Sequence, residues 1–286
     1  MLPVALALAS AALFGGMTVA LRIALVRIPG AEAAAAATAI TGLGVCLVAA
    51  GVEGGRGDVD LSGVWAFALA GILAPGGSQI LFTLAIRDAG ASRTSVAVGA
   101  APLVSVAIAL TLLDEPPHPE LIAGAALVVA GGLALAFEKT PPEHVRRIGL
   151  LYAVGATILF ASRDNLVRHL SDGDVPPATA AAATLVTGLV IALLFARGVP
   201  SRERLIAFAP AGLCFGLSYV CLFEAFFHGR VTVVAPLVAT ESLWGVGLSI
   251  LLLRRTELVG PRLVLGALLI VAGGVLIGIG AGKYVL

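Results

Sequence analysis

The sequence contains two copies of one apolar segment at a constant spacing. The hexapeptide Leu-Val-Val-Ala-Gly-Gly at 127–132 recurs 142 positions later as Leu-Ile-Val-Ala-Gly-Gly at 269–274. At the same spacing Gly124 corresponds to Gly266, and Glu115 to Glu257. Self-similarity at a fixed period indicates that a structural unit is itself repeated. The chain must therefore be divided into matching units before single residues are interpreted.

The composition predicts that lipid is the main solvent of this chain. Of its 286 residues 59% are hydrophobic and 12% charged, whereas soluble domains are about a quarter charged. A net charge of +1 provides no basic stripe, so nucleic acid is not an expected partner. The cysteines Cys46, Cys214 and Cys221 lie in apolar runs without a CxxC pair, so we expect no disulfide, metal site or cofactor.

Polar and proline-containing breaks divide the chain into ten apolar pieces. Each has the length of about 20 residues that a helix needs to cross a hydrocarbon core of about 30 Å. The sequence therefore predicts an all-α integral membrane protein with ten transmembrane helices. The expected spans are 3–24, 31–51, 63–86, 91–113, 119–138, 147–169, 177–197, 205–227, 231–253 and 258–281.

The two halves of the chain correspond helix by helix. A polar stretch near 138–147 separates a first five-helix repeat, 1–140, from a second, 141–286. Segment 36–43 returns at 182–189, a spacing of 146, and Gly71 in the third predicted helix returns as Gly212, a spacing of 141. Because five is odd, the second repeat enters the membrane from the opposite side. Two inverted repeats place their interface at the bilayer midplane and suit alternating access to either side.

The paired helix-loop-helix units carry a family resemblance. One unit runs from Pro102 through Glu115 to 131–132, the other from Glu241 through Glu257 to 273–274, and the halves open with Phe-Gly-Gly at 14–16 and Phe-Ala-Ser at 160–162. The chain resembles the drug/metabolite transporter superfamily, specifically the EamA-type transporters with ten helices. The resemblance covers essentially the whole chain.

The resemblance implies a function but not a substrate. It implies secondary active or facilitative export of small metabolites, amino acids or drugs across the cytoplasmic membrane, without ATP hydrolysis. The expected partners are a small-molecule substrate, the lipid bilayer and, as an open alternative, protons; monomer and homodimer both remain open. The family often has a Glu-Pro pair in the fourth helix of a repeat, whereas this chain has Ala101 before Pro102 and Ser242 after Glu241.

Glu241 is the ionisable residue placed most centrally in a predicted helix. It lies midway between Arg230 and Arg254, and Trp244, three residues on, shares its face. Inserting a charge at this depth costs about 2.5–3.5 kcal/mol, so such a residue faces the protein interior or a wet cavity. Three interpretations remain: substrate or proton binding, a structural salt bridge, and a pore-facing group without a role.

The sixth predicted helix carries Arg163, Asp164 and Asn165. Asp164 and Arg168 are four residues apart and could pair on one face, which would direct Arg163 elsewhere. Arg163 could then anchor a carboxylate or phosphate through its fork of donors. The alternative is that Arg163 neutralises Asp164 or Glu241.

Polar residues near the end of the eighth predicted helix form another candidate group. Glu224 and His228 are four residues apart and follow Tyr219. Such a pair could relay protons, whereas a solvated pair at the membrane interface is the alternative.

In the third predicted helix, Ser78 and Gln79 follow Pro-Gly-Gly at 75–77. This sequence favours a kink that frees carbonyl groups for a ligand, although kinks are also ordinary packing features. The resulting hypothesis is a central cavity lined mainly by predicted helices 1, 3, 4, 6, 8 and 9, with Glu241 and Arg163 as its charges. The repeat places Glu241 of the second half at the position equivalent to Pro102 of the first half.

The charges of the loops indicate on which side of the membrane the two termini lie. Twelve lysines and arginines lie in the loops after odd-numbered predicted helices and four in the other set. The positive-inside rule then favours both termini outside, whereas the resemblance implies both in the cytoplasm. Both orientations remain open at this point.

Two other functions remain as alternatives, a lipid-carrier flippase and an intramembrane enzyme. A lipid-carrier flippase would need a lateral opening lined by apolar residues with basic groups at one mouth. An intramembrane enzyme would need a catalytic constellation, and the sequence has no HExxH or GxSxG pattern. We therefore expect no enzyme activity and no catalytic residues.

Overall fold

The computed structural model is helical throughout the part of the chain that it describes, which is 2–55, 61–104, 107, 119–136, 146–171, 175–229, 234, 237–253 and 259–283. Glu115 and Glu257, which recur in the sequence, lie outside these residues. The helices of the first half are α1 (Leu2–Arg27), α2 (Ala31–Gly54), α3 (Val64–Gly71), the π-helical η1 (Ile72–Gly77), α4 (Ser78–Ala89), α5 (Ala91–Val98) and α7 (Pro119–Ala136). Those of the second half are α8 (Arg147–Leu170), α9 (Pro177–Ala196), α10 (Arg202–His228), α12 (Glu241–Leu252) and α13 (Pro261–Lys283).

Six helical stretches are long and apolar enough to cross a membrane. They are Leu2–Arg27, Ala31–Gly54, Val64–Ala89, Arg147–Leu170, Pro177–Ala196 and Arg202–His228. The apolar helices Ile122–Ala134, Glu241–Leu252 and Pro261–Ile277 are shorter. The sequence-based prediction of an all-helical, multi-pass membrane fold is therefore confirmed for the described residues.

The predicted kink in the third span is present. Ala74 has extended backbone angles, φ −144° and ψ 125°, between α3 and α4. Pro75 follows it, and proline cannot donate the hydrogen bond that a continuous helix requires. α4 then begins at Ser78 and buries both Ser78 and Gln79. The kink thus separates two helical pieces within one span.

The predicted spans 91–113 and 231–253 are not single uninterrupted helices. α5 ends at Val98, residues 99–100 form a turn, and helical backbone resumes at 101–104. Pro102 fits there because the first turn of a helix does not need its missing N–H. In the second half residues 239–240 form a turn, and α12 begins at Glu241. Each half therefore has a helix break at corresponding positions.

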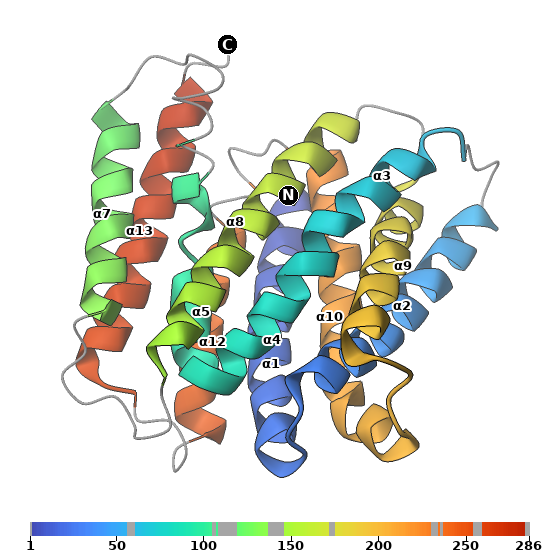
Figure 1. Cartoon of the computed structure of the whole chain (residues 1–286). Helices are drawn as coiled ribbons and strands as arrows, with labels where there is room; N and C mark the ends of the chain where they lie inside the picture. Colours follow the sequence, from blue (N-terminus) through green and yellow to red (C-terminus); the bar gives the residue numbers. More distant parts are fainter. Residues whose placement is uncertain are drawn as a thin grey trace.

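The helix pair α7 and α13 lies at one edge of the bundle, at the left of Figure 1. Glycines of the repeated sequence form the contact between these two helices. A Cβ atom added at Gly124 would lie 2.7 Å from the carbonyl oxygen of Gly273, and one added at Gly131 would lie 2.7 Å from that of Gly266. Only glycine permits this approach, as in small-residue contacts between membrane helices. The repeated glycines therefore hold the two halves together at this edge.

A second pair of equivalent contacts lies between the third span of each half and the second span of the other. A Cβ atom added at Gly71 would lie 2.9 Å from Thr184 Cα, and one added at Gly212 would lie 2.9 Å from the carbonyl oxygen of Thr38. Gly71 and Gly212 are related by the 141-residue spacing, and Thr38 and Thr184 by the 146-residue spacing. Equivalent residues thus make equivalent contacts across the boundary between the halves.

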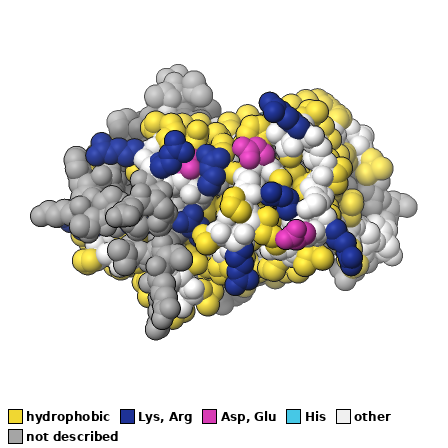
Figure 2. Space-filling view, turned by 60° about the horizontal axis from the view of Figure 1, so that its bottom comes forward, with side chains coloured by type: hydrophobic (Ala, Val, Ile, Leu, Met, Phe, Trp, Pro, Cys, Tyr) yellow, Lys and Arg dark blue, Asp and Glu magenta, His cyan; other side chains and the backbone are white. Residues whose placement is uncertain are grey.

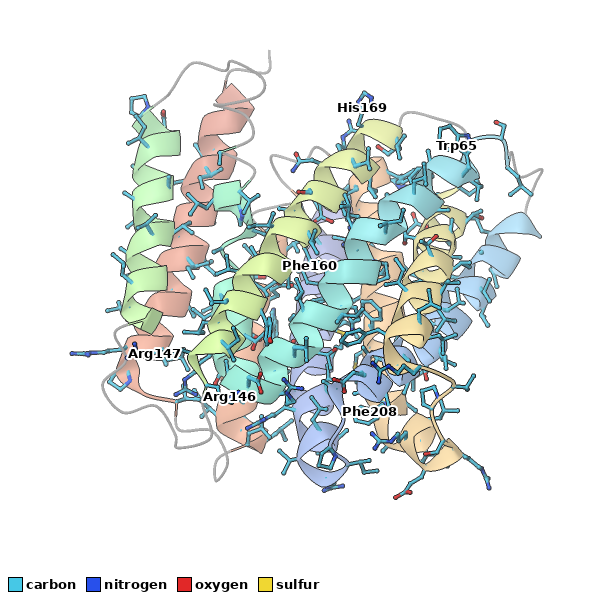
Figure 3. The ribbon with its side chains drawn as sticks, viewed as in Figure 1. Trp65, Arg146, Arg147, Phe160, His169 and Phe208 are labelled. Carbon is cyan, nitrogen blue, oxygen red and sulfur yellow. The ribbon has the colours of Figure 1, made fainter. Side chains whose placement is uncertain are left out.

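Aromatic rings fill the centre of the bundle. The ring centroid of Phe14 lies 5.1 Å from that of Phe82 and 5.7 Å from that of Phe160, which occupies the middle of the molecule in Figure 3. Phe14 and Phe160 correspond to each other in the repeat and pack edge to face. These rings come from α1, α4 and α8, so the core joins both halves.

One end of the molecule is rich in arginine. Figure 2 views this end, and Figure 3 places Arg146 and Arg147 there, with Trp65 and His169 at the opposite end. α1 ends here at Arg27, and α13 begins here with Arg262 in its first turn. The described part of the chain therefore has an unequal charge distribution along the bundle axis.

Two adjacent glycines of α7 test the packing between α7 and α13. Replacing Gly131 by alanine should lower the melting temperature, because the new Cβ atom meets the backbone of α13. Replacing Gly132 by alanine is the matched control, since no atom lies within 4 Å of a Cβ atom added there. Both changes gain the same helix propensity, about 1 kcal/mol. Equal melting temperatures for the two purified variants would contradict the proposed contact.

Candidate functional site

A small cavity lies where the helix breaks of the two halves meet. The first half contributes Val98, Ala101 and Pro102, and the break before α12 contributes Val238, Ala239 and Glu241. Ala161, Asp164 and Asn165 of α8 and Phe226 of α10 complete the lining. The cavity has a volume of about 30 Å³, which is enough for ordered water but not for an organic solute. A larger ligand therefore requires the walls to move apart.

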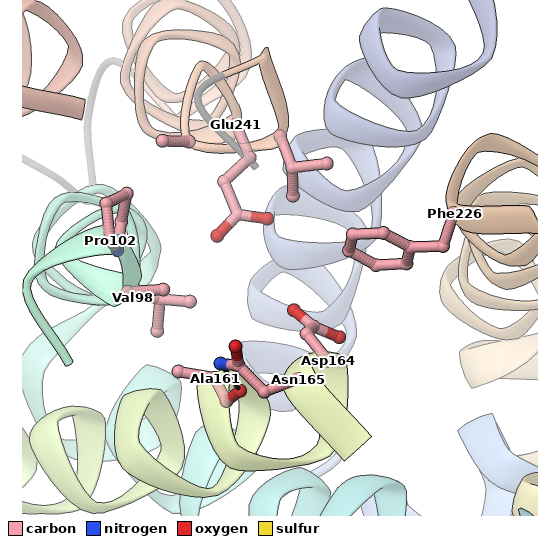
Figure 4. A pocket seen from close by; sticks show the side chains of 10 residues that line it. Val98, Pro102, Ala161, Asp164, Asn165, Phe226 and Glu241 are labelled. Carbon is pink, nitrogen blue, oxygen red and sulfur yellow. Dashed lines mark hydrogen bonds between the residues drawn. The ribbon is translucent and has the colours of Figure 1, made fainter. Parts of the chain in front are cut away.

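Glu241 projects into the cavity from the first position of α12. Figure 4 shows its carboxylate and that of Asp164 directed toward the same space. Glu241 is 7% exposed, and no described residue forms a hydrogen bond or ion pair with it. Its position at a helix N-terminus provides a partial positive charge, but no side-chain counter-ion. A buried carboxylate of this kind is suited to binding a proton or a cationic ligand.

Asp164 has a counter-ion that lies outside the cavity. Its Oδ1 atom is 2.9 Å from Arg163 Nε. The guanidinium of Arg163 lies over the ring of Tyr219, 4.7 Å from the centroid, and 5.6 Å from that of Phe223. Arg163 is 2% exposed and does not line the cavity. The structure therefore gives Arg163 the alternative role, neutralising Asp164, and does not direct it toward a substrate.

The same helix positions are neutral in the first half. The 146-residue spacing relates Arg163 to Met17 and Asp164 to Thr18. Thr18 uses its hydroxyl within its own helix, donating to the carbonyl of Phe14 at 2.9 Å. The repeated scaffold can therefore hold either a charged or a neutral pair at this place, and only the second half has the charged pair.

The other predicted site residues lie in three different places. Asn165 lines the cavity, and its Nδ2 donates to the carbonyl of Ala161 at 2.8 Å. Trp244 is 46% exposed and does not line the cavity, although it lies one helical turn from Glu241. Spacing alone could not place it, because residues one turn apart on a helix can differ in burial.

Tyr219 and Glu224 both belong to α10 but differ in environment. Tyr219 is buried, and its ring packs against those of Phe215 and Phe223. Glu224 lies near the end of the helix, with its Oε2 atom 3.4 Å from His228 Nδ1, and both side chains are partly exposed. The geometry favours the solvated-pair alternative for Glu224 and His228.

Ser78 and Gln79 are buried beside the kink but do not line the cavity. Ser78 Oγ, Gln79 Nε2 and Gln79 Oε1 form no hydrogen bond with any residue that the structure describes. Polar atoms of this kind need a partner such as water or a ligand. They remain a second polar position within the bundle, separate from the cavity.

Sequence reasoning missed Phe226 and the apolar walls at Val98 and Val238. Apolar residues in an apolar helix carry no signal in a single sequence that separates cavity lining from packing. Pro102 was identified only as the equivalent of Glu241, and the structure shows why both matter. Each lies in the first turn of the helical segment after a break, and both line the same cavity.

The charged pair can be tested by copying the neutral pair of the first half. Asp164→Thr should destabilise the protein by up to about 3–5 kcal/mol, because it leaves the buried Arg163 cation without its counter-ion. Arg163→Met should do the same to Asp164. The double variant Arg163→Met/Asp164→Thr should be more stable than either single variant. Thermal unfolding of the four purified proteins measures this coupling, and additive losses would rule it out.

Comparisons with known proteins agree with the fold. The sequence model of the EamA-like transporter family matches residues 1–137 and 147–279. A protein of known crystal structure is 21% identical to the chain, with a TM-score of 0.67, over 99% of both chains. No match to a curated protein was found. Because the family match covers nearly the whole sequence, the chain belongs to the EamA-like transporter family, within the drug/metabolite transporter superfamily.

Proposed function

We propose that this protein carries a small organic solute across the cytoplasmic membrane by alternating access. The observation that carries the proposal is the cavity at the boundary of the two halves, into which the buried Glu241 projects. The solute would bind between the two helix breaks, with Glu241 and Asp164 as the charged groups. Binding sites built from interrupted helices near the repeat interface are typical of secondary transporters. Export is the direction that the family resemblance favours.

We propose further that ten membrane spans form two inverted five-helix repeats, 1–140 and 141–286. Helix contacts support this arrangement because they occur in equivalent pairs. α1 packs on α10 as α8 packs on α4, and α2 packs on α10 as α9 packs on α3. In Figure 1 α1 runs from the upper to the lower end, whereas α8 runs from the lower to the upper end. Opposite directions are expected of inverted repeats.

The breaks provide a way for the cavity to open. Residues 101–102 come from the first half, and 238–241 from the second, so a rotation between the halves would separate opposite walls of the cavity. The α7 and α13 contact lies away from this cavity, at the edge of the bundle. It joins the two halves, so a rotation between them would pivot about this contact. Movement of one repeat against the other would then expose the site to each side in turn.

The role of Glu241 can be separated from folding. Glu241→Gln keeps the size and hydrogen-bonding capacity of the side chain but removes its charge, so it should abolish transport or uncouple it from a pH gradient. Flux into proteoliposomes, with and without a pH gradient, measures this. Glu224→Gln is the matched control, because Glu224 lies in the partly exposed pair at the end of α10. Wild-type flux and pH dependence in Glu241→Gln would remove Glu241 from the mechanism.

We propose that the arginine-rich end faces the cytoplasm, with both termini outside. The arginines at one end of the bundle support this orientation through the positive-inside rule. Ser62 lies near the opposite end and Glu203 at the arginine-rich end, and both are exposed. In intact cells a membrane-impermeant thiol reagent should therefore label Ser62→Cys but not Glu203→Cys, in a background without the native cysteines. The reverse labelling pattern would establish the family's usual orientation.

A further inference from the structure

The charges of the cavity indicate what kind of solute it accepts. Of its ten lining residues two are ionisable, and both are acids, Asp164 and Glu241. The neighbouring cation, Arg163, lies behind Asp164 against the rings of Tyr219 and Phe223. A carboxylate-bearing solute entering the cavity would therefore meet two acids and no cation among the described lining residues. The lining is complementary to positive charge.

From these observations we propose that the cavity binds an organic cation, a solute with an ammonium group on an apolar body, in exchange for a proton at Glu241. This inference rests on the proposed transport function and names its substrate class. Asp164 is paired with Arg163, whereas Glu241 has no counter-ion among the described residues. A bound cation or a bound proton can each neutralise Glu241, but not both together. The two ligands therefore compete for one carboxylate.

The rest of the lining fits the apolar part of such a solute. Val98, Pro102 and Val238 present hydrocarbon, and Phe226 presents an aromatic ring beside the two carboxylates (Figure 4). Aromatic faces attract organic cations once water is excluded. Neutral polar side chains are nearly absent from this lining, Asn165 being the exception. The same surface is poor for a sugar, which needs many hydrogen-bonding partners.

A metal ion is a less suitable ligand. Hard cations such as Ca²⁺ need six to eight oxygen ligands, and most of the cavity wall is hydrocarbon. No group of three or more histidine, cysteine, aspartate or glutamate side chains that could hold a metal occurs among the residues that the structure describes. An organic cation, whose charge is spread over a larger body, matches two carboxylates and an apolar wall.

No other charged side chain that the structure describes lines the cavity with Asp164 and Glu241. α12 packs mainly on α1, α5 and α13, and the described charged residues of these three helices, Arg22, Arg27, Arg93 and Arg262, do not line the cavity. Asp164 of α8 lines the cavity together with Glu241. Two neighbouring carboxylates disfavour a second negative charge, which strengthens the binding of either a proton or a cation. The exchange therefore depends on this pair.

Three probes of similar shape and different charge test the inference on the full-length protein in detergent. Benzyltrimethylammonium carries a fixed positive charge, benzyl alcohol is neutral, and phenylacetate is negative. Calorimetry in two buffers of different ionisation enthalpy should show binding of the ammonium probe with release of a proton. Where Glu241 is protonated in the free protein, affinity should fall about tenfold for each unit decrease in pH. Preference for phenylacetate or benzyl alcohol would overturn the inference, as would failure of the ammonium probe to bind.

Variants test whether ammonium binding and proton release both depend on Glu241. Glu241→Gln should lose both ammonium binding and proton release, whereas Glu241→Asp should restore part of each, and Glu224→Gln should match the wild type. If Glu241→Gln does not fold, the charge preference and proton release of the wild type still decide the question. Unchanged ammonium binding with proton release in a folded Glu241→Gln protein would overturn the assignment.

Counterflow in proteoliposomes separates this inference from the proposed function. Movement of the ammonium probe against a proton gradient supports both. Binding with proton release but without movement would leave the cation site in place and overturn transport. Movement of a neutral or anionic solute, without competition by the ammonium probe, would leave transport in place and overturn the cation site.

Discussion

Close approach of helix backbones at small residues is the interaction on which the rest of this structure depends. Lipid offers no hydrophobic force between helices, so helices associate through packing and hydrogen bonds. Gly124 and Gly131 of α7 meet Gly273 and Gly266 of α13, and the third span of each half meets the second span of the other at Gly71 or Gly212. These contacts bring the two helix breaks face to face. The cavity exists because the breaks lie where the halves meet.

The scaffold is nearly symmetric, but its polar groups are not. The first half has Met17, Thr18 and Pro102 where the second has Arg163, Asp164 and Glu241. In the proposed mechanism, symmetric contacts let the halves move as equivalent bodies, and the charged groups give the site its specificity. A charged pair costs more in lipid than the neutral pair of the first half, so stability alone does not account for it. We propose that Asp164 of this pair is present for the solute that the cavity binds.

Much of the fold could be predicted from the sequence, because apolar length and repeat spacing are strong signals. The kink near Pro75 was also predictable, since proline removes a helix hydrogen bond. The interruptions at 99–100 and 239–240 were not, because short turns within apolar segments leave little trace in composition. For the site, Glu241, Asp164 and Asn165 were identified from their depth in apolar helices. Helical spacing could not show that Trp244 lies outside the cavity lining, and it left open whether Arg163 faces a ligand or neutralises Asp164.

The central claim is that the cavity between the two breaks opens during transport. Cysteines introduced at Ala101 and Ala239, which line it from opposite halves, can be joined by a short, reducible bifunctional thiol reagent. The native cysteines would first be replaced, and the unlinked variant must still carry solute. The account predicts that cross-linking stops flux in proteoliposomes and that reduction restores it. Undiminished flux through fully cross-linked protein would contradict the account.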